Sequence, residues 1–435
     1  MSVAKAFCCV IFIIFLPILS LASGEAQEEP EVLKGELNIS DYNIRDLGTI
    51  DLDGEWEFYY NRLLSPQDFK DGLNNNMELV HVPSIWNDIL YKGIKLGGQG
   101  YATYRLTVHK KERDQLLAFF IPNVYTSYKL YVNDSLVAQN GEVGESKDKS
   151  SPSWKPLYKT FICKDSKMEI IWQVSNFYHN RGGIHKVLKF GSPESVAFTR
   201  EKSVISNILS VGGLIVLGLF FIIFFFIRKG QMATLYFGLL CILWALRALF
   251  SNIYLITDLM PGITWNAAIR IEYLSLYASV LAGVLFITKT YGEFFNPLFK
   301  WIIITINYLF IALSLILPPL FFTSMLPAYQ FFLAVNLAYI VVIIVKAIMD
   351  KQKEAWFSAA SIFIGISLFA YEITAYIFIF KVNHILINLG YLAIFFLNSL
   401  VIAAHFVNAY HKMHNLEQEK ENETLSRLGR TYRYR

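Results

Sequence analysis

Residues 176–183, Asn-Phe-Tyr-His-Asn-Arg-Gly-Gly, concentrate hydrogen-bonding side chains beside two glycines. Adjacent glycines permit a tight backbone, and the Asn, His and Arg side chains gather donors and acceptors there. Arg181 is suited to hold a carboxylate or hydroxyl by parallel hydrogen bonds, with Asn176 and His179 as further polar contacts. The alternative is an ordinary solvated turn above a membrane, and the sequence supports both interpretations equally.

Aromatic side chains in the N-terminal half could stack on the apolar faces of a sugar ring. Three of them lie inside alternating strand patterns and are predicted to be core residues: Trp56, Tyr104 and Trp172. Trp86 and Trp154 lie in loop-like sequence, where recognition residues concentrate. We therefore predict Trp86, Trp154 and the nearby Tyr101 as ligand contacts.

The cysteines and histidines predict no metal or cofactor chemistry. Among the four cysteines, only Cys163 belongs to the expected exported part, so a disulfide framework cannot form there. No Cys/His cluster has the spacing of zinc ligands. We expect no catalytic residues, no metal and no cofactor in this chain.

Three ionisable residues stand within long apolar segments: Arg247, Glu272 and Glu372. Such residues are costly in a membrane and usually face the interior of a helical bundle. At about 1.5 Å of rise per residue, all three fall at a similar depth in the outer half of a bilayer. We predict that they form an ion-paired cluster that couples the helices; the alternative is that each reaches separately for the membrane surface.

The elements that must position these residues begin with a membrane block over 204–407. Its seven apolar segments are each long enough to cross a hydrocarbon core of about 30 Å, and continuous apolar runs exclude barrel strands. The predicted helices are Val204–Ile227, Gln231–Ile253, Ala267–Thr288, Leu298–Leu320, Met325–Lys346, Trp356–Phe380 and His384–Val407.

Basic residues predict the orientation of this block. The expected inner breaks carry Arg228, Lys229, Lys289 and several further lysines, whereas Lys381 is the clear case in the outer breaks. The positive-inside rule then places residues before Ser203 outside and the tail inside. Residues 1–23 have a charged start, an apolar core and small residues for cleavage, which predicts a signal peptide; an uncleaved anchor helix is the alternative.

Between the signal and the membrane block, a polar linker over 24–36 precedes a domain over 37–199. Its short runs alternate in polarity and are separated by Asn-Asp, Asn-Gly and Gly-Gly pairs, which is typical of antiparallel strands. This spacing predicts an all-β sandwich of the jelly-roll type. The net charge of +4 is too small and dispersed to indicate nucleic acid binding.

After the last membrane segment, residues 408–435 are predicted to continue as a short cytoplasmic helix. Its apolar residues keep no heptad over several turns, so a coiled coil is only weakly supported. Within the membrane, Ala278/Ala282, Ser279/Gly283 and Ser361/Gly365 have the spacing that permits close helix approach. That spacing serves internal packing more often than it serves a homodimer.

Several motifs in one order carry a family resemblance. They are residues 52–59 (Leu-Asp-Gly-Glu-Trp-Glu-Phe-Tyr), 82–86 (Val-Pro-Ser-Ile-Trp), 100–106 (Gly-Tyr-Ala-Thr-Tyr-Arg-Leu), 130–134 (Leu-Tyr-Val-Asn-Asp), 175–177 (Ser-Asn-Phe) and 181–183 (Arg-Gly-Gly). With the membrane block, the chain resembles the bacterial seven-transmembrane receptors with diverse intracellular signalling modules. The exported part is similar to the sugar-binding, galactose-binding-like jelly roll of family-2 glycoside hydrolases.

The resemblance implies a multi-pass sensor of the bacterial inner membrane, whose extracytoplasmic domain binds a small polar ligand, carbohydrate first. Family members commonly continue into a catalytic output module, whereas no such module follows the last helix here. The expected output is therefore a partner, a cytoplasmic kinase or cyclase, and the chain itself is not expected to be an enzyme. The alternative is a transporter or channel with an exported substrate-binding domain, although no internal repeat supports it.

Overall fold

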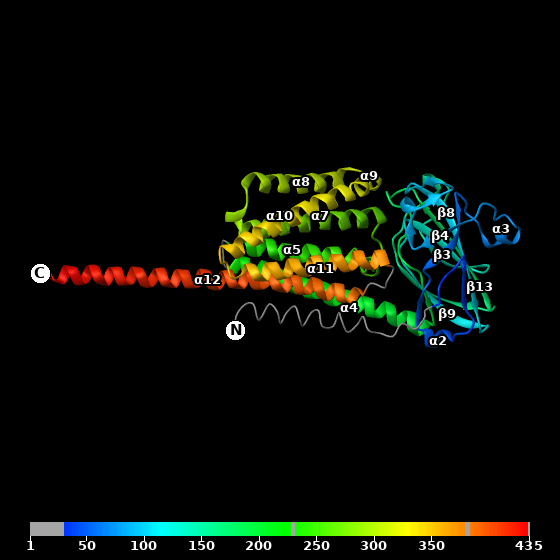
Figure 1. Cartoon of the computed structure of the whole chain (residues 1–435), viewed down its shortest axis with the longest axis horizontal. Coiled ribbons are helices and arrows are strands. Elements are labelled where there is room, and N and C mark those ends of the chain that lie inside the picture. The colour runs from blue at the N-terminus through cyan, green and yellow to red at the C-terminus, as the bar shows by residue number, and fades with distance from the viewer. Residues whose placement is uncertain (1–29, 228–230, 252, 379–382, 434–435) are drawn as a thin grey trace.

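The computed structural model describes residues 30–227, 231–251, 253–378 and 383–433. A β-sandwich lies at one end of a helical bundle, and the last helix projects from the opposite end (Figure 1). Within the described residues, seven helices are long and apolar enough to cross a membrane. This is the predicted fold class; the predicted signal peptide lies outside the described residues.

The sandwich consists of two main sheets. The larger has seven strands: β11 (Ser135–Asn140), β10 (Ser127–Val132), β13 (Lys167–Asn176), β8 (Gly100–Lys110), β3 (Gly54–Tyr60) and β4 (Glu78–Val82) in that order, with β1 (Glu36–Ile39) parallel to β8. The smaller has the order β12 (Leu157–Cys163), β9 (Gln115–Ile121), β15 (Lys189–Gly191) and β2 (Thr49–Asp51). Short ribbons pair β14 (Gly183–Ile184) with β5 (Ser84–Ile85) and β6 (Leu90–Tyr91) with β7 (Ile94–Lys95).

Every second side chain along the strands points into the space between the two sheets and fills it. Trp56, Tyr104 and Trp172 have no exposed surface, which confirms their prediction as core residues. Tyr104 is aligned with Trp172 across β8 and β13. The two short helices of the sandwich, α2 (Ile44–Leu47) and α3 (Pro66–Lys70), lie in connections between strands.

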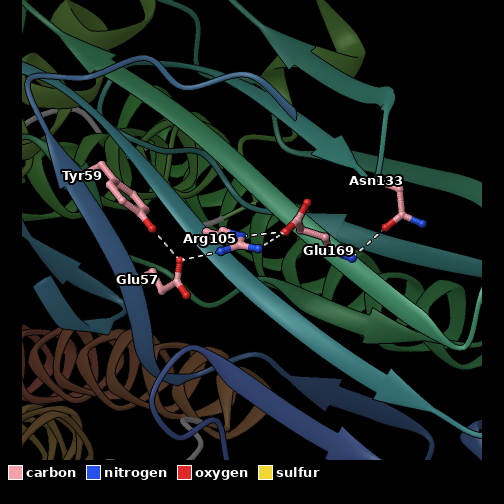
Figure 2. Close-up of polar contacts among 5 residues, drawn as sticks. All are labelled: Glu57, Tyr59, Arg105, Asn133 and Glu169. Atoms are coloured by element: carbon pink, nitrogen blue, oxygen red, sulfur yellow. Dashed lines mark hydrogen bonds and ion pairs between the residues drawn. The ribbon is translucent and has the colours of Figure 1, made fainter. Parts of the chain in front are cut away.

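The outer face of the larger sheet carries an ion-paired ladder across three strands (Figure 2). Arg105 on β8 donates from Nη1 to Glu57 Oε2 on β3 at 3.1 Å and from Nε to Glu169 Oε1 on β13 at 2.6 Å. Tyr59 Oη donates to the same Glu57 oxygen at 2.7 Å, and Asn133 Oδ1 accepts the Glu169 N–H at 2.8 Å. These buried and half-buried side chains join β3, β8, β13 and the turn after β10.

The helices follow the sandwich in the order α4 (Pro193–Ile227), α5 (Met232–Leu249), α6 (Ile256–Leu259), α7 (Trp265–Thr290), α8 (Pro297–Ile316), α9 (Pro319–Ser324), α10 (Leu326–Met349), α11 (Ala355–Phe378) and α12 (His384–Arg433). The predicted first membrane helix, Val204–Ile227, is the C-terminal part of α4, which extends further toward the N-terminus. The helix begins at Pro193, where Ser192 Oγ accepts the Ser195 N–H at 3.2 Å, and its first turns are too polar to register as a membrane segment. The predicted end of the fourth was wrong, because Pro318 and Pro319 interrupt it and start α9.

Helices α4 and α12 run side by side along the bundle toward the end away from the sandwich (Figure 1). Helix α4 continues directly from β15, and it packs against α5 and α12. Asn388 Nδ2 on α12 donates to Ser206 Oγ on α4 at 2.9 Å. Helix α12 then runs without a break through the bundle and beyond it (Figure 1), which confirms that residues after 407 continue the last helix.

Candidate functional site

The turn over 176–183 is built around the Asn176 side chain. Its Nδ2 lies within hydrogen-bond distance of three carbonyl oxygens, those of Gly98 at 2.6 Å, His179 at 2.7 Å and Arg181 at 2.8 Å. Its Oδ1 accepts the N–H groups of Tyr178 and His179. Asn176 is fully buried, so the structure uses it to shape the turn and leaves it no surface for a ligand.

The two glycines of the turn lie directly against the Trp86 ring. A Cβ at Gly182 would meet Trp86 Cε3 at 2.3 Å, and Gly183 has a φ of +90° with Trp86 Cδ1 2.8 Å from a Cβ position. Trp86 itself has no exposed surface, and its Nε1 donates to the Tyr104 hydroxyl at 2.7 Å. The structure therefore corrects the prediction for Trp86: its indole is a core residue that supports the turn, because the glycines close over it.

The same turn contacts the helical bundle. The Asn180 N–H donates to Thr323 Oγ1 on α9 at 3.1 Å. Trp154, in the loop before β12, stacks on Tyr254 with ring centroids 5.0 Å apart and lies 6.0 Å from Trp265 at the start of α7. Trp154 is buried in this contact, so aromatic packing fixes the sandwich on the bundle.

Tyr125 lies between two imidazole rings beside this contact. Its ring stacks on His179 at 4.4 Å and on His185 at 4.2 Å. Burial raises the pKa of the Tyr125 hydroxyl to about 12, opposed by the neighbouring Arg181 guanidinium. Burial lowers the pKa of His179 to about 3 and that of His185 well below its ordinary value, so both imidazoles are neutral near pH 7.

Charged side chains from both parts converge behind these rings. Lys186 Nζ donates to Asn123 Oδ1 at 3.1 Å and lies 5.5 Å from the centre of the Tyr254 ring. Burial lowers the pKa of Lys186 to about 8, and the Glu272 carboxylate on α7 opposes that shift. Arg247 on α5 donates from Nη1 to the backbone oxygen of Glu272 at 3.2 Å.

We call this set of residues the interface cluster: Tyr125, Trp154, His179, Arg181, His185 and Lys186 from the sandwich, and Arg247, Tyr254, Trp265 and Glu272 from the bundle and the loop before α7. At the rim, Asp258 on α6 pairs with Arg200 at 3.1 Å and with Lys155 at 3.9 Å. The cluster thus joins aromatic surface, cations and one carboxylate across the boundary between the two parts.

The structure brings together some of the predicted site residues and separates others. Arg247 and Glu272 meet, but through a backbone oxygen and not through the predicted ion pair. Glu372 on α11 is half-buried and makes no ion pair with Arg247 among the described residues. Tyr101 is half-buried on β8 beside Tyr60, and none of the side-chain contacts found in the described ranges joins it to the interface cluster.

Several residues of the interface cluster were missed from the sequence: Tyr125, His185, Lys186, Tyr254 and Trp265. One signal could have found two of them, because His185-Lys186 follows the glycine turn and shortly precedes the first membrane helix. A polar turn at that position must face the membrane block or the space above it. Tyr254 and Trp265 flank a short loop between apolar segments, and nothing in their spacing distinguishes them from ordinary interfacial aromatics.

One family model matches the membrane block. The family model described as "7TM diverse intracellular signalling" matches residues 204–405. This match confirms the resemblance stated from the sequence for the helical part of the chain.

Solved structures resemble the N-terminal part. A GH2 β-galacturonidase from Eisenbergiella tayi bound to galacturonate has 13% identity and a TM-score of 0.24, covering 33% of this chain and 24% of that one. A β-glucuronidase from an uncultured Clostridium species has 16% identity and a TM-score of 0.26, covering 34% of this chain and 29% of that one. This chain thus spans less than a third of either enzyme, and no curated protein matches it.

Proposed function

We propose that this chain is a membrane receptor whose β-sandwich lies outside the cytoplasmic membrane and binds a small polar ligand, carbohydrate being the first class to test. Binding is transmitted through the seven helices to α12 and to a partner in the cytoplasm. The observation that carries this proposal is the direct contact of the sandwich with the bundle through Trp154, Tyr178 and Asn180.

The route through the molecule follows from this contact. A ligand that shifts the sandwich relative to the bundle acts on α4, which is continuous with β15, and on α7, which carries Trp265 and Glu272. Helix α4 packs on α12 and is hydrogen-bonded to it through Ser206 and Asn388. A ligand shifts such an equilibrium only by its difference in affinity for the two states, so the moving contact has to lie where the ligand binds or where the sandwich meets the helices.

The test uses the full chain in lipid nanodiscs. Spin labels at Lys351→Cys, in the turn after α10, and Asn415→Cys, on α12, report the distance between the inner end of the bundle and the tail. A glycan and metabolite screen by thermal stability identifies a ligand, which should then change the distance distribution. Uptake of that ligand into proteoliposomes without any change in α12 would instead support a transporter.

A screen that yields no ligand would count against a small-molecule sensor and favour a protein partner for the sandwich. The orientation has a separate test. A reporter fused after Arg435 should be active only in the cytoplasm. The adjoining ends of α7 and α8 carry Lys289 and Lys300, the connection between α10 and α11 carries Lys351 and Lys353, and both regions lie at the end of the bundle away from the sandwich.

A further inference from the structure

The cations of the interface cluster outnumber its carboxylate. Arg181 and Lys186 approach from the sandwich and Arg247 from α5, whereas Glu272 is the one acidic member of the cluster. The neutral imidazoles of His179 and His185 add no charge, and Asp258 at the rim is already paired with Arg200 and Lys155. The cluster therefore presents net positive charge.

Buried polar atoms in the same place lack hydrogen-bond partners within the described part of the chain. Three of them are donors, Trp154 Nε1, Trp265 Nε1 and Asn123 Nδ2; Glu272 Oε2 is an acceptor, and His185 Nδ1 is a donor or an acceptor according to its tautomer. Trp154, Trp265 and Asn123 are each at least nine-tenths buried. Because a buried polar group without a partner costs free energy, this set of donors indicates a missing acceptor-rich group.

We propose that the interface cluster binds a small hydroxylated carboxylate between the sandwich and the bundle. Arg181, Lys186 and Arg247 neutralise its carboxylate, the indole N–H groups donate to its oxygens, and Glu272 accepts a hydrogen bond from one of its hydroxyl groups. The Trp154 and Tyr254 rings provide apolar surface for the carbon skeleton. Arg181 and Lys186 are half-buried at the boundary between the two parts.

The position of this site explains how binding acts on the helices. Arg181 and Lys186 belong to the segment between β13 and β15, and Arg247 and Glu272 belong to α5 and α7. A ligand held by both groups ties the two parts together, whereas the like charges of Arg181, Lys186 and Arg247 oppose close approach when no anion is present. This inference rests on the receptor function proposed above and specifies where its ligand binds and of what class it is.

The experiment compares acids with neutral analogues on the full chain in nanodiscs. D-glucuronate is paired with D-glucose, and D-gluconate with sorbitol, because each pair differs at the carboxylate. We expect at least one acid to raise the thermal midpoint while its neutral partner does not, and we expect its affinity to fall as KCl is raised. Failure of both acids, or equal effects of acid and neutral partner, would overturn the site.

Substitutions and a matched control test which residues bind the acid. Arg181→Gln and Lys186→Gln should each raise the dissociation constant of the acid at least tenfold, while Lys155→Gln at the exposed rim should leave it within twofold. Should one variant fail to fold, the other variant and the KCl dependence still decide. A neutral sugar that binds equally well to the wild type and to both variants would leave the receptor function standing and refute the anionic site.

Discussion

Arg105 shows how one side chain holds three strands of the sandwich. Glu57 is directly opposite Arg105 across β3 and β8, and Glu169 is its diagonal neighbour on β13. Both carboxylates and the guanidinium are about four-fifths buried, so they interact more strongly than an exposed pair would. Removing the arginine leaves two largely buried carboxylates, one on each side of β8, without a cation.

We expect Arg105→Met to lower the free energy of unfolding of the sandwich by about 2 kcal/mol, within the range for hydrogen bonds to charged groups. Lys70→Met removes an exposed pair with Asp134, in which both side chains are more than half exposed, and should change stability by less than about 0.5 kcal/mol. Denaturant unfolding of the two variants measures the difference. Equal effects would mean that the Glu57–Arg105–Glu169 contacts contribute no more to the free energy of unfolding than an exposed ion pair does.

His179 makes the stability of the sandwich depend on pH. Its pKa of about 3 in the folded protein is below the ordinary value near 6.5, so below pH 6.5 the unfolded chain binds a proton that the folded chain does not. The stabilisation is fully present above pH 6.5 and is lost as the pH falls toward 3, by up to about 1.4 kcal/mol per pH unit.

Replacing His179 with Phe keeps a ring against Tyr125 and removes this titration. We therefore expect the stability of His179→Phe to fall less steeply than that of the wild type between pH 6.5 and 5, measured as unfolding midpoints at each pH. His109→Phe, at an exposed histidine of β8, is the matched control. An unchanged slope in His179→Phe would show that other groups carry the pH dependence.

Among the elements, α4 and α5 make a close crossing. A Cβ at Gly218 would meet the backbone oxygen of Gly238 at 3.0 Å, and a Cβ at Gly238 would meet that of Gly218 at 2.9 Å. Small residues allow helix backbones to approach in a membrane, where packing is a main source of association. The spacings predicted from the sequence also serve internal packing, since Gly283 faces Leu240 and Gly365 faces Ile394, but they did not include this pair.

We expect Gly218→Val to force α4 and α5 apart and to lower the stability of the bundle by about 1–3 kcal/mol, the usual cost of overpacking. Gly212→Val, two turns earlier on the same helix, is the control, because no atom lies within 4 Å of its Cβ position. Thermal unfolding of both variants in nanodiscs measures the effect. A similar loss of stability in the two variants would show that the loss comes from helix propensity and not from the crossing of α4 and α5.

The sequence predicted whether each element is a helix or a strand better than it predicted which residues pack around that element. Apolar length identified the membrane helices and alternation identified the strands, because both patterns follow from the solvent on each face. Depth along the helices correctly placed Arg247 and Glu272 at one level. Depth does not give the direction in which a side chain points around its helix axis, so the prediction also included Glu372, which makes no ion pair with Arg247 among the described residues. Trp86 looked like a loop residue because the glycines that cover it lie almost a hundred residues later.

At the scale of the whole molecule, the contact between sandwich and bundle was the part that local patterns could not predict. Trp154 is about a hundred residues away in the sequence from Tyr254 and Trp265, and only the folded chain brings it against them. The sequence did single out Trp154 and the turn over 176–183 as special. In the structure, both lie at the boundary through which any signal from the sandwich has to pass.

Replacing Trp154 should therefore loosen the contact between the sandwich and the bundle without unfolding either part. Aromatic pairs contribute about 0.5–1.5 kcal/mol beyond their buried area, so Trp154→Ala should make local opening of the interface about tenfold more frequent. Hydrogen exchange should rise in residues 176–186 and at the start of α7, with little change in β8 or β13. Trp301→Ala, at an exposed position on α8, should leave all of these rates unchanged. Faster exchange throughout the sandwich would show that Trp154 supports its fold, and unchanged exchange at the start of α7 would show that the stacked rings do not hold the two parts together.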